Sequence, residues 1–482
     1  MPAPLQTTDL TTLSATNASR MLNTGEITSE ALVRAYIARI TVRDASVLAW
    51  AHFKPEKILA AARDCDAARR QGQSFDRLAG IPVGIKDIID TTDYPTENGS
   101  AIFAGRRPDR DASIVAQLKA AGAIIMGKTV TTELAFFGPG KTKNPRDPSR
   151  TPGGSSSGSA AAVADFQVPL AIGTQTAGSI IRPASYCGVI GYKPTFGYVS
   201  RSGVLAQSAP LDTIGGYARS VEDIALLMDS ICGYDATDAA MISGVKPPLS
   251  AALTKPLARA PRFAFIKSPA WPNADAAARR AYEDYAGGFG ARAEVVETPL
   301  PSEFDSCLRL QQIVQFADIA KNYGPIADAN PDRVSVKLKE IIAEGRTFSA
   351  ADIAAARAEA EPLYDALQPI LENYDAILTP AAPGVALSGL GATGSPIFNA
   401  LWTYLGMPCI SLPLLEVDGL PLGVQLAGGA QPGRRPASRC AVAARLRRLN
   451  PNTALTQIYL LSTMFLSPGT ATTLDRAGCV TA

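Results

Sequence analysis

Apolar residues recur at helical spacing in the first part of the chain. Leu32, Tyr36 and Ile40 lie four residues apart, and similar spacing continues to Gln71. This period places apolar side chains along one face of a helix. We therefore predict an N-terminal helical region over residues 1–75.

Short apolar runs and helical segments alternate beyond this region. Runs rich in valine and isoleucine predict buried strands, and a stretch rich in alanine and glutamate over about 270–370 predicts a helical insertion. Strands alternating with helices indicate an α/β fold, here a core domain over residues 76–430. The predicted strands are 80–89, 123–126, 168–172, 376–380 and 408–414, and the predicted helices include 112–121 and 159–164.

Composition indicates a well-filled globular protein. The chain has 482 residues, 46% of them apolar and 19% charged, with a net charge of +2. No stripe of lysine and arginine is interleaved with aromatic residues, so we expect no nucleic-acid partner. The start of the chain lacks the pattern of a signal peptide and no run of 18 apolar residues occurs, so we expect a cytoplasmic protein without a membrane partner.

Cysteine and histidine usage bears on metals and redox chemistry. The seven cysteines are scattered and form no CxxC pair, and His52 is the single histidine. A zinc site needs several such ligands, so we expect reduced cysteines and no metal or cofactor.

The last segment, residues 431–482, departs from the rest in charge. It holds seven arginines and one acidic residue, Asp475, and without it the net charge changes from +2 to −4. Residues 431–448 also lack the apolar spacing of an amphipathic helix. We interpret the segment as an atypical basic tail, for which a shifted reading frame near the end of the coding sequence is the leading explanation and a genuine basic tail the alternative.

Two serines stand in glycine-rich segments 24 positions apart. Ser155 follows Gly153-Gly154, and Ser179 ends Gly173-Thr-Gln-Thr-Ala-Gly-Ser179 after an apolar strand. Glycines permit positive φ and close backbone approach, and a turn at a strand end can aim successive N–H groups at one point, as an oxyanion hole requires. The single histidine lies in a region predicted to be helical, so a serine nucleophile would more readily use a lysine as its base.

Lys86 is the candidate for that base. It is the one lysine in the apolar segment Ala79-Gly-Ile-Pro-Val-Gly-Ile-Lys86-Asp-Ile-Ile89. Burial disfavours the charged form of a lysine and lowers its pKa, which leaves an amine able to accept a proton. The alternative is an ion pair with a carboxylate such as Asp87.

Together these elements resemble the amidase signature family of Ser-Ser-Lys amide hydrolases. The resemblance runs from about Leu22 to Gly429 and includes Gly188-Val-Ile-Gly-Tyr-Lys-Pro-Thr195, Leu211-Asp-Thr-Ile-Gly215, Arg219-Ser-Val-Glu-Asp223 and Gly419-Leu-Pro-Leu-Gly-Val-Gln-Leu-Ala427. It implies a single large mixed β-sheet surrounded by helices, and a cis peptide bond into Ser155.

The resemblance also implies the site. Ser179 is the expected nucleophile, Ser155 the relay and Lys86 the ultimate base. The backbone N–H groups of Thr176, Ala177, Gly178 and Ser179 are the expected oxyanion hole.

This chain departs from most family members beside the nucleophile. Gln175 stands where most have Asp, and Ile181 where most have Arg. Loss of both is understandable if the two normally pair, because losing one would leave a buried charge unpaired. An arginine occurs instead at Arg182, as in the malonamidase-like branch, and it either meets a substrate carboxylate or forms a structural ion pair.

A phosphate-loop pattern, Gly122-Ala-Ile-Ile-Met-Gly-Lys-Thr129, is also present. Its inner residues favour a strand over a loop of free N–H groups, so we predict a strand there.

We predict an amide-bond hydrolase that acts on small-molecule amides and releases ammonia or an amine. Carbamate or ester hydrolysis at the same site, an amidotransferase A subunit, and a catalytically silent scaffold are the alternatives, and a homodimer is left open. The intact Lys86, Ser155 and Ser179 argue against the silent scaffold.

Overall fold

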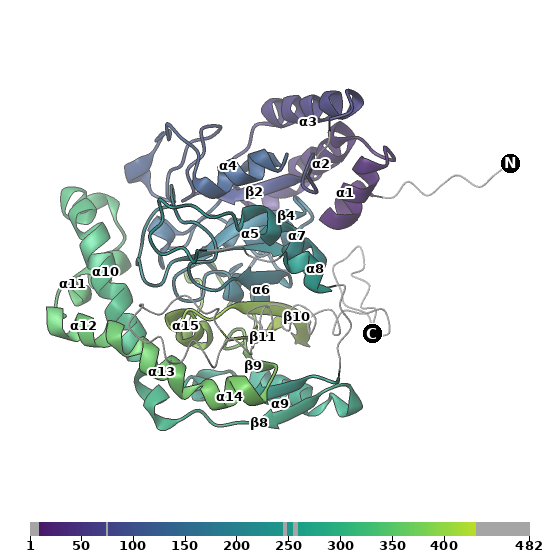
Figure 1. Ribbon diagram of the computed structural model, residues 1–482. Coiled ribbons are helices and arrows are strands. Elements are labelled where there is room, and N and C mark those ends of the chain that lie inside the picture. Colours follow the sequence, from purple (N-terminus) through teal and green to yellow (C-terminus); the bar gives the residue numbers. More distant parts are fainter. Residues whose placement is uncertain (1–8, 74–75, 244–247, 254–258, 430–482) are drawn as a thin grey trace.

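One mixed β-sheet runs through the whole molecule. The computed structural model describes residues 9–73, 76–243, 248–253 and 259–429 (Figure 1). In this described part, eleven strands pair in the order β1-β3-β2-β4-β6-β5-β10-β11-β9-β7-β8. The strands are β1 Trp50–His52, β2 Pro82–Lys86, β3 Ile124–Thr129, β4 Leu170–Gln175, β5 Ile190–Lys193, β6 Thr213–Ala218, β7 Arg262–Phe265, β8 Glu294–Glu297, β9 Ala376–Pro380, β10 Cys409–Val417 and β11 Leu420–Ala427.

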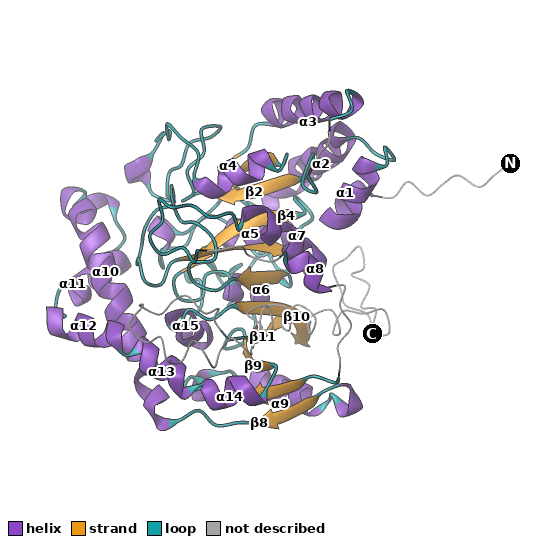
Figure 2. Cartoon of the chain, in the orientation of Figure 1, coloured by secondary structure: helices purple, strands orange, loops and turns teal. Residues whose placement is uncertain are grey.

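Helices surround this sheet (Figure 2). Figure 1 shows α1 to α3 grouped beside the β2 end, and α10 to α12 as a layer along one side. The described helices are α1 Ala15–Asn23, α2 Ser29–Val47, α3 Pro55–Arg70, α4 Ser113–Ala120, α5 Ser157–Ala164, α6 Ile181–Cys187, α7 Val221–Ile231, α8 Leu249–Leu253, α9 Ala276–Gly287, α10 Cys307–Ala329, α11 Val336–Gly345, α12 Ala350–Ala358, α13 Ala360–Ala366, α14 Gln368–Asn373 and α15 Ile397–Tyr404.

The single mixed sheet with surrounding helices confirms the predicted fold class. Each predicted strand overlaps an observed one, and the phosphate-loop pattern is indeed largely strand, β3. Strands β2 to β6 are buried along their full length. Burial on both faces explains why β2, β3 and β4 were predicted from apolar runs, while β5 and β6, which contain more glycine and polar residues, were not predicted.

Two short strands lie in regions that were predicted to be helical. Residues 1–75 include β1, so His52 lies on a strand and not in a helix. β1 is an edge strand of three residues whose Trp50 pairs with Thr129 of β3. The insertion over about 270–370 likewise contains β8, which pairs with β7. Strands this short carry no clear period of their own, because their partners determine them.

The N-terminal helices dock on the core through a buried carboxylate. Asp223 at the start of α7 accepts hydrogen bonds from the backbone N–H groups of Ala15 and Thr16, each at 2.8 Å. The apolar face of α2 predicted from the sequence is buried at Leu32, Tyr36 and Ile40. A charged anchor and an apolar face together hold this region against the sheet.

The parallel direction of β2 and β4 brings the candidate catalytic residues to the same edge of the sheet. β2 runs parallel to both β3 and β4, with Gly84 opposite Ala171 and Ile85 opposite Ile172. The carboxyl ends of β2 and β4 therefore meet at one edge of the sheet. Lys86 ends β2 there, and the glycine-rich turn that carries Ser179 follows β4.

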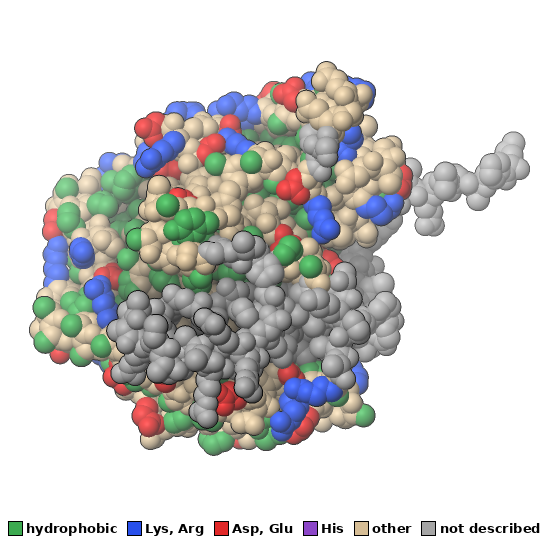
Figure 3. Space-filling model, viewed as in Figure 1, with side chains coloured by type: hydrophobic (Ala, Val, Ile, Leu, Met, Phe, Trp, Pro, Cys, Tyr) green, Lys and Arg blue, Asp and Glu red, His purple; other side chains and the backbone are tan. Residues whose placement is uncertain are grey.

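The atypical tail, residues 431–482, lies outside the described residues. Over the described part of the face in Figure 3, basic and acidic side chains are interspersed. None of the helices described here is both long and apolar enough to cross a membrane.

Candidate active site

Lys86 and Ser155 are brought into direct contact. Lys86 is fully buried, and its Nζ lies 2.7 Å from Ser155 Oγ and 2.7 Å from Thr174 Oγ1. Burial lowers the pKa of Lys86 well below 10.5, and the charge of Asp212 opposes that shift. An uncharged amine in this position can accept a proton from Ser155.

Asp87 is not the partner of Lys86. Its carboxylate lies 3.2 Å from the Nζ of Lys128, which is also buried. Burial lowers the pKa of Lys128 to about 8, against the opposing charge of Asp87. The alternative of a Lys86–Asp87 ion pair is therefore wrong.

Ser155 lies in the loop just before α5. The Gly154–Ser155 peptide bond is cis, as expected from the resemblance. The carbonyl of Ser155 accepts a hydrogen bond from the N–H of Thr132 at 3.2 Å. Ser155 is 3% exposed, so water has little access to its contact with Lys86.

Ser179 is partly exposed within an otherwise buried segment. From Gln167 to Thr195 every residue is buried except Ser179. In the part of the chain described, the N–H groups of residues 176–179 donate to no protein acceptor, whereas those of Ile180 and Ile181 donate to Gln175 Oε1. A reachable hydroxyl beside four free N–H groups is an arrangement that can bind an oxyanion. No hydrogen bond joins the side chains of Ser155 and Ser179 among the described residues.

Gln175 and Thr403 form a neutral network under this turn. Gln175 Oε1 accepts from the N–H groups of Ile180 at 2.8 Å and Ile181 at 3.0 Å, and its amide donates to Thr403 Oγ1 at 2.9 Å. Thr403, on α15, donates to the carbonyl of Ala177 at 2.7 Å. Uncharged contacts thus occupy the place where most family members are expected to have an Asp and an Arg.

Arg182 is an interior side chain. It is 2% exposed, and it donates from Nε to the carbonyl of Thr393 at 2.8 Å and from Nη2 to the carbonyl of Gly154 at 2.6 Å. Burial lowers its pKa to about 10. The guanidinium thus contacts the residue preceding Ser155 and makes no ion pair among the described residues. Its Nη1 has no protein partner there, and its role toward substrate stays a prediction.

Asp212 is a component of the site that the sequence-based analysis did not single out. Its carboxylate accepts from Thr176 Oγ1 at 2.6 Å and from the N–H groups of Gln207 at 2.8 Å and Ser208 at 2.9 Å. It lies in Leu211-Asp-Thr-Ile-Gly215, one of the segments that carry the resemblance. An acidic residue at the start of a buried strand was the available signal.

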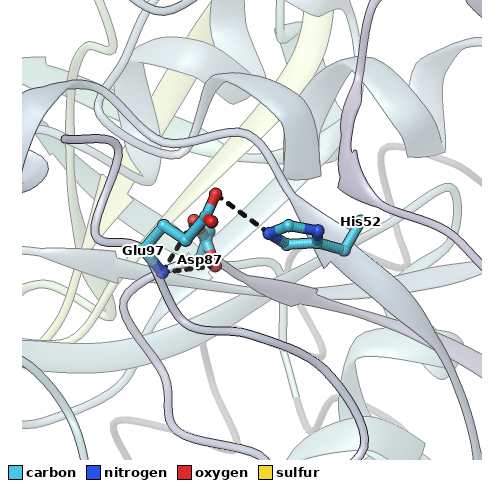
Figure 4. A group of neighbouring side chains, drawn as sticks. All are labelled: His52, Asp87 and Glu97. Atoms are coloured by element: carbon cyan, nitrogen blue, oxygen red, sulfur yellow. Dashed lines mark hydrogen bonds and ion pairs between the residues drawn. The ribbon is translucent and has the colours of Figure 1, made fainter. Parts of the chain in front are cut away.

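His52 belongs to a separate cluster, shown in Figure 4. Its Nε2 lies 3.1 Å from Glu97 Oε2, and one ligand atom each from His52, Asp87 and Glu97 lie within 4.8 Å of one another. Such a set could ligate a cation, but Lys128 already supplies a positive charge to Asp87. The single histidine contacts neither Lys86 nor the two motif serines in the described hydrogen bonds.

Comparison with known proteins shows the family of this chain. A model of the Amidase family matches residues 31–432. The chain belongs to the amidase family. It is 35% identical to the A subunit of the glutamyl-tRNA(Gln) amidotransferase of Chloroflexus aggregans, over 87% of this chain and 93% of that protein. The corresponding protein of Salinispora arenicola is also 35% identical, over 87% of this chain and 94% of its own length.

Solved structures of amidase-family proteins share the fold. The peptide amidase of Stenotrophomonas maltophilia superposes with a TM-score of 0.79 at 26% identity, covering 98% of this chain and 99% of its own. A protein from a vestigial complex tied to the origins of an s-triazine catabolic enzyme gives a TM-score of 0.82 at 26% identity, covering 94% and 98%. The amidase family and its hydrolytic chemistry on carbon–nitrogen bonds therefore apply to this chain.

Proposed function

We propose that this amidase hydrolyses small linear amides through Ser179, Ser155 and Lys86. The observation that carries the proposal is the 2.7 Å contact between the buried Lys86 Nζ and Ser155 Oγ. Burial lowers the pKa of this lysine well below 10.5 and so favours the uncharged form that can accept a proton from the adjacent hydroxyl. The partly exposed Ser179 beside free N–H groups supplies the nucleophile and the anion site.

The proposed steps conserve atoms and charge. Lys86 takes a proton from Ser155, Ser155 takes one from Ser179, and Ser179 Oγ bonds to the substrate carbonyl carbon. The resulting oxyanion is held by the N–H groups of residues 176–179. The C–N bond breaks as the proton returns through Ser155 to the leaving nitrogen, and water then hydrolyses the acyl-enzyme by the same relay.

The assignment is tested with purified protein and a panel of amides, carbamates and esters. Ser179→Ala should lose at least about a thousandfold in kcat, since removal of a nucleophile costs that much or more. A fluorophosphonate should label Ser179 in the unsubstituted protein and nothing in the variant. Labelling of another serine, with Ser179 untouched, would contradict the assignment. Faster turnover of carbamates or esters than of amides would favour those alternatives.

A second candidate is the role of an amidotransferase A subunit, favoured by the two bacterial relatives at 35% identity. That role requires companion subunits. Glutaminase activity that appears only with such companions, together with no turnover of simple amides by the chain alone, would support it. A small-molecule amide substrate, a homodimer and a cytoplasmic location remain predictions.

A further inference from the structure

A cavity opens beside Thr174, the residue whose hydroxyl contacts Lys86. It has a volume of about 210 Å³ and is lined at its inner end by Thr174, Thr176 and Asp212 and by apolar side chains such as Ile88 and Leu205. Its outer lining includes the exposed Ala206 and Ala209. Pockets for drug-sized ligands are roughly 300–1,000 Å³, so this cavity suits a short chain.

The cavity reaches a neighbour of the proton relay, Thr174, although Lys86, Ser155 and Ser179 are not among its lining residues. Thr174 lines it, and the hydroxyl of the same residue lies 2.7 Å from Lys86 Nζ. Thr176 lines it too, and belongs to the turn that carries Ser179. In the proposed reaction the proton held by Lys86 must reach the leaving nitrogen. The amine part of the substrate therefore lies on the relay side, where this cavity is.

The charge in the cavity is not balanced. Asp238 is paired with Arg201, whose Nε and Nη2 donate to its two carboxylate oxygens at 2.9 and 2.8 Å. Asp212 has only hydroxyl and backbone N–H donors, and forms no ion pair within the described residues. Burial raises the pKa of Asp212 to about 6, and its hydrogen bonds and the charge of Arg201, which also lines the cavity, oppose that shift.

We propose that this cavity holds the leaving amine of the substrate and that Asp212 selects amines carrying a second, positively charged group. The substrate class is then an amide formed on one end of a short diamine. The proposal rests on the proposed amide hydrolysis. Apolar walls accommodate the methylene chain, and a partly accessible carboxylate at the inner end attracts the ammonium group.

The test compares three acetyl amides that differ only at the far end of the amine. N-(4-aminobutyl)acetamide is cationic, N-butylacetamide is neutral, and 4-acetamidobutanoate is anionic. We expect kcat/KM to be about tenfold higher for the cationic than for the neutral amide, and lowest for the anionic one, as for a partly screened charge pair. Equal kcat/KM values for the three amides, or a higher value for the anionic than for the cationic amide, would overturn the proposal.

Substitutions in the cavity test whether its residues cause the preference for the cationic amide. Asp212→Asn should bring the cationic-to-neutral ratio close to one, whatever it does to the absolute rates. Asp212→Asn also alters the contact with Thr176, so a second pair of variants is placed at the exposed lining. Ala206→Lys should lower the cationic-to-neutral ratio of kcat/KM, and Ala206→Glu should raise it. Val42→Lys, on α2 and 76% exposed, is the matched control and should leave it unchanged. An unaltered ratio in all three cavity variants would refute the assignment.

A binding measurement separates this proposal from the proposed function. Butylammonium should bind the Ser179→Ala protein in calorimetry, and Asp212→Asn should weaken that binding about tenfold, while butanol should bind little. Binding without hydrolysis of any amide would mean that the proposed reaction fails but the cation site stands. Hydrolysis of amides without a preference for the cationic one would mean that the proposed reaction stands but the cation site does not.

Discussion

At the residue scale, Lys86 determines how the site responds to pH. Burial lowers its pKa, so activity should rise with pH as the lysine loses its proton. Lys86→Met should be inactive at every pH, because methionine accepts no proton. The measurement is a profile of kcat/KM from pH 6 to 10, and near-normal rates of the variant over that range would place the base elsewhere.

The same residue should link stability to pH. Between the lowered pKa of folded Lys86 and 10.5, the unfolded chain binds one proton more than the folded chain. The free energy of unfolding should therefore rise with pH in that window, by at most about 1.4 kcal/mol per pH unit. Urea unfolding of the Lys86→Met variant should lack this contribution. An identical slope in both proteins would mean that folded Lys86 stays protonated.

Arg182 offers a test of substrate charge on the acyl side. Its Nε and Nη2 donate hydrogen bonds to the carbonyls of Thr393 and Gly154. Its Nη1 has no partner among the described residues. If Nη1 meets a carboxylate, Arg182→Lys should reduce kcat/KM about tenfold to a hundredfold more for monoamides of dicarboxylic acids than for neutral amides. Steady-state kinetics with succinamate and butyramide make the comparison. Equal losses would show that the residue acts only on the loop before Ser155.

At the element scale, α15 positions the turn after β4. Thr403 on that helix donates to the carbonyl of Ala177, and Gln175 donates to Thr403. Thr403→Val keeps the shape but removes the hydroxyl, so kcat should fall about tenfold or more while KM changes little. Thr403→Ser retains the hydroxyl and should stay near normal.

An inhibitor distinguishes this positioning role from a loss of packing. An aldehyde that adds to Ser179 forms a tetrahedral oxyanion, so its affinity should fall in Thr403→Val by the same factor as kcat/KM. A variant that loses thermal stability but keeps its aldehyde affinity would show that Thr403 only packs.

At the scale of the whole molecule, the α10–α12 layer is attached to the core by a carboxylate. Asp318 of α10 accepts from Ser208 Oγ at 2.7 Å and pairs with Arg357 of α12. Asp318→Ala should lower the free energy of unfolding by about 1–3 kcal/mol, because it removes a hydrogen bond to a largely buried carboxylate. Urea denaturation measures the change.

Asp328 provides the matched control on the same helix. It pairs with Arg346, and both side chains are about half exposed, at 61% and 49%. Asp328→Ala should cost less than about 1 kcal/mol, as is usual for a surface ion pair. Equal losses in the two variants would mean that the contact with Ser208 adds nothing.

The catalytic candidates could be predicted from the sequence because their signals are local. A serine after two glycines, a serine on a glycine-rich turn and a lysine within an apolar strand each depend on neighbours a few residues away. Interior strands β2, β3, β4, β9 and β10 were predicted for the same reason, since burial on both faces leaves an apolar run, whereas β5, β6, β7 and β11 were not predicted. These patterns, with the resemblance they carry, determined the fold class, the family and the three proposed catalytic side chains.

Only the tertiary structure decided the contacts that connect distant segments. Thr176 meets Asp212 36 positions away, Gln175 meets Thr403 228 positions away, and Arg182 meets Thr393 211 positions away. The edge strand that holds His52 likewise exists through its pairing with β3. No local pattern encodes such pairs, because hydrogen bonds and charge balance depend on which side chains the packed sheet and helices bring together.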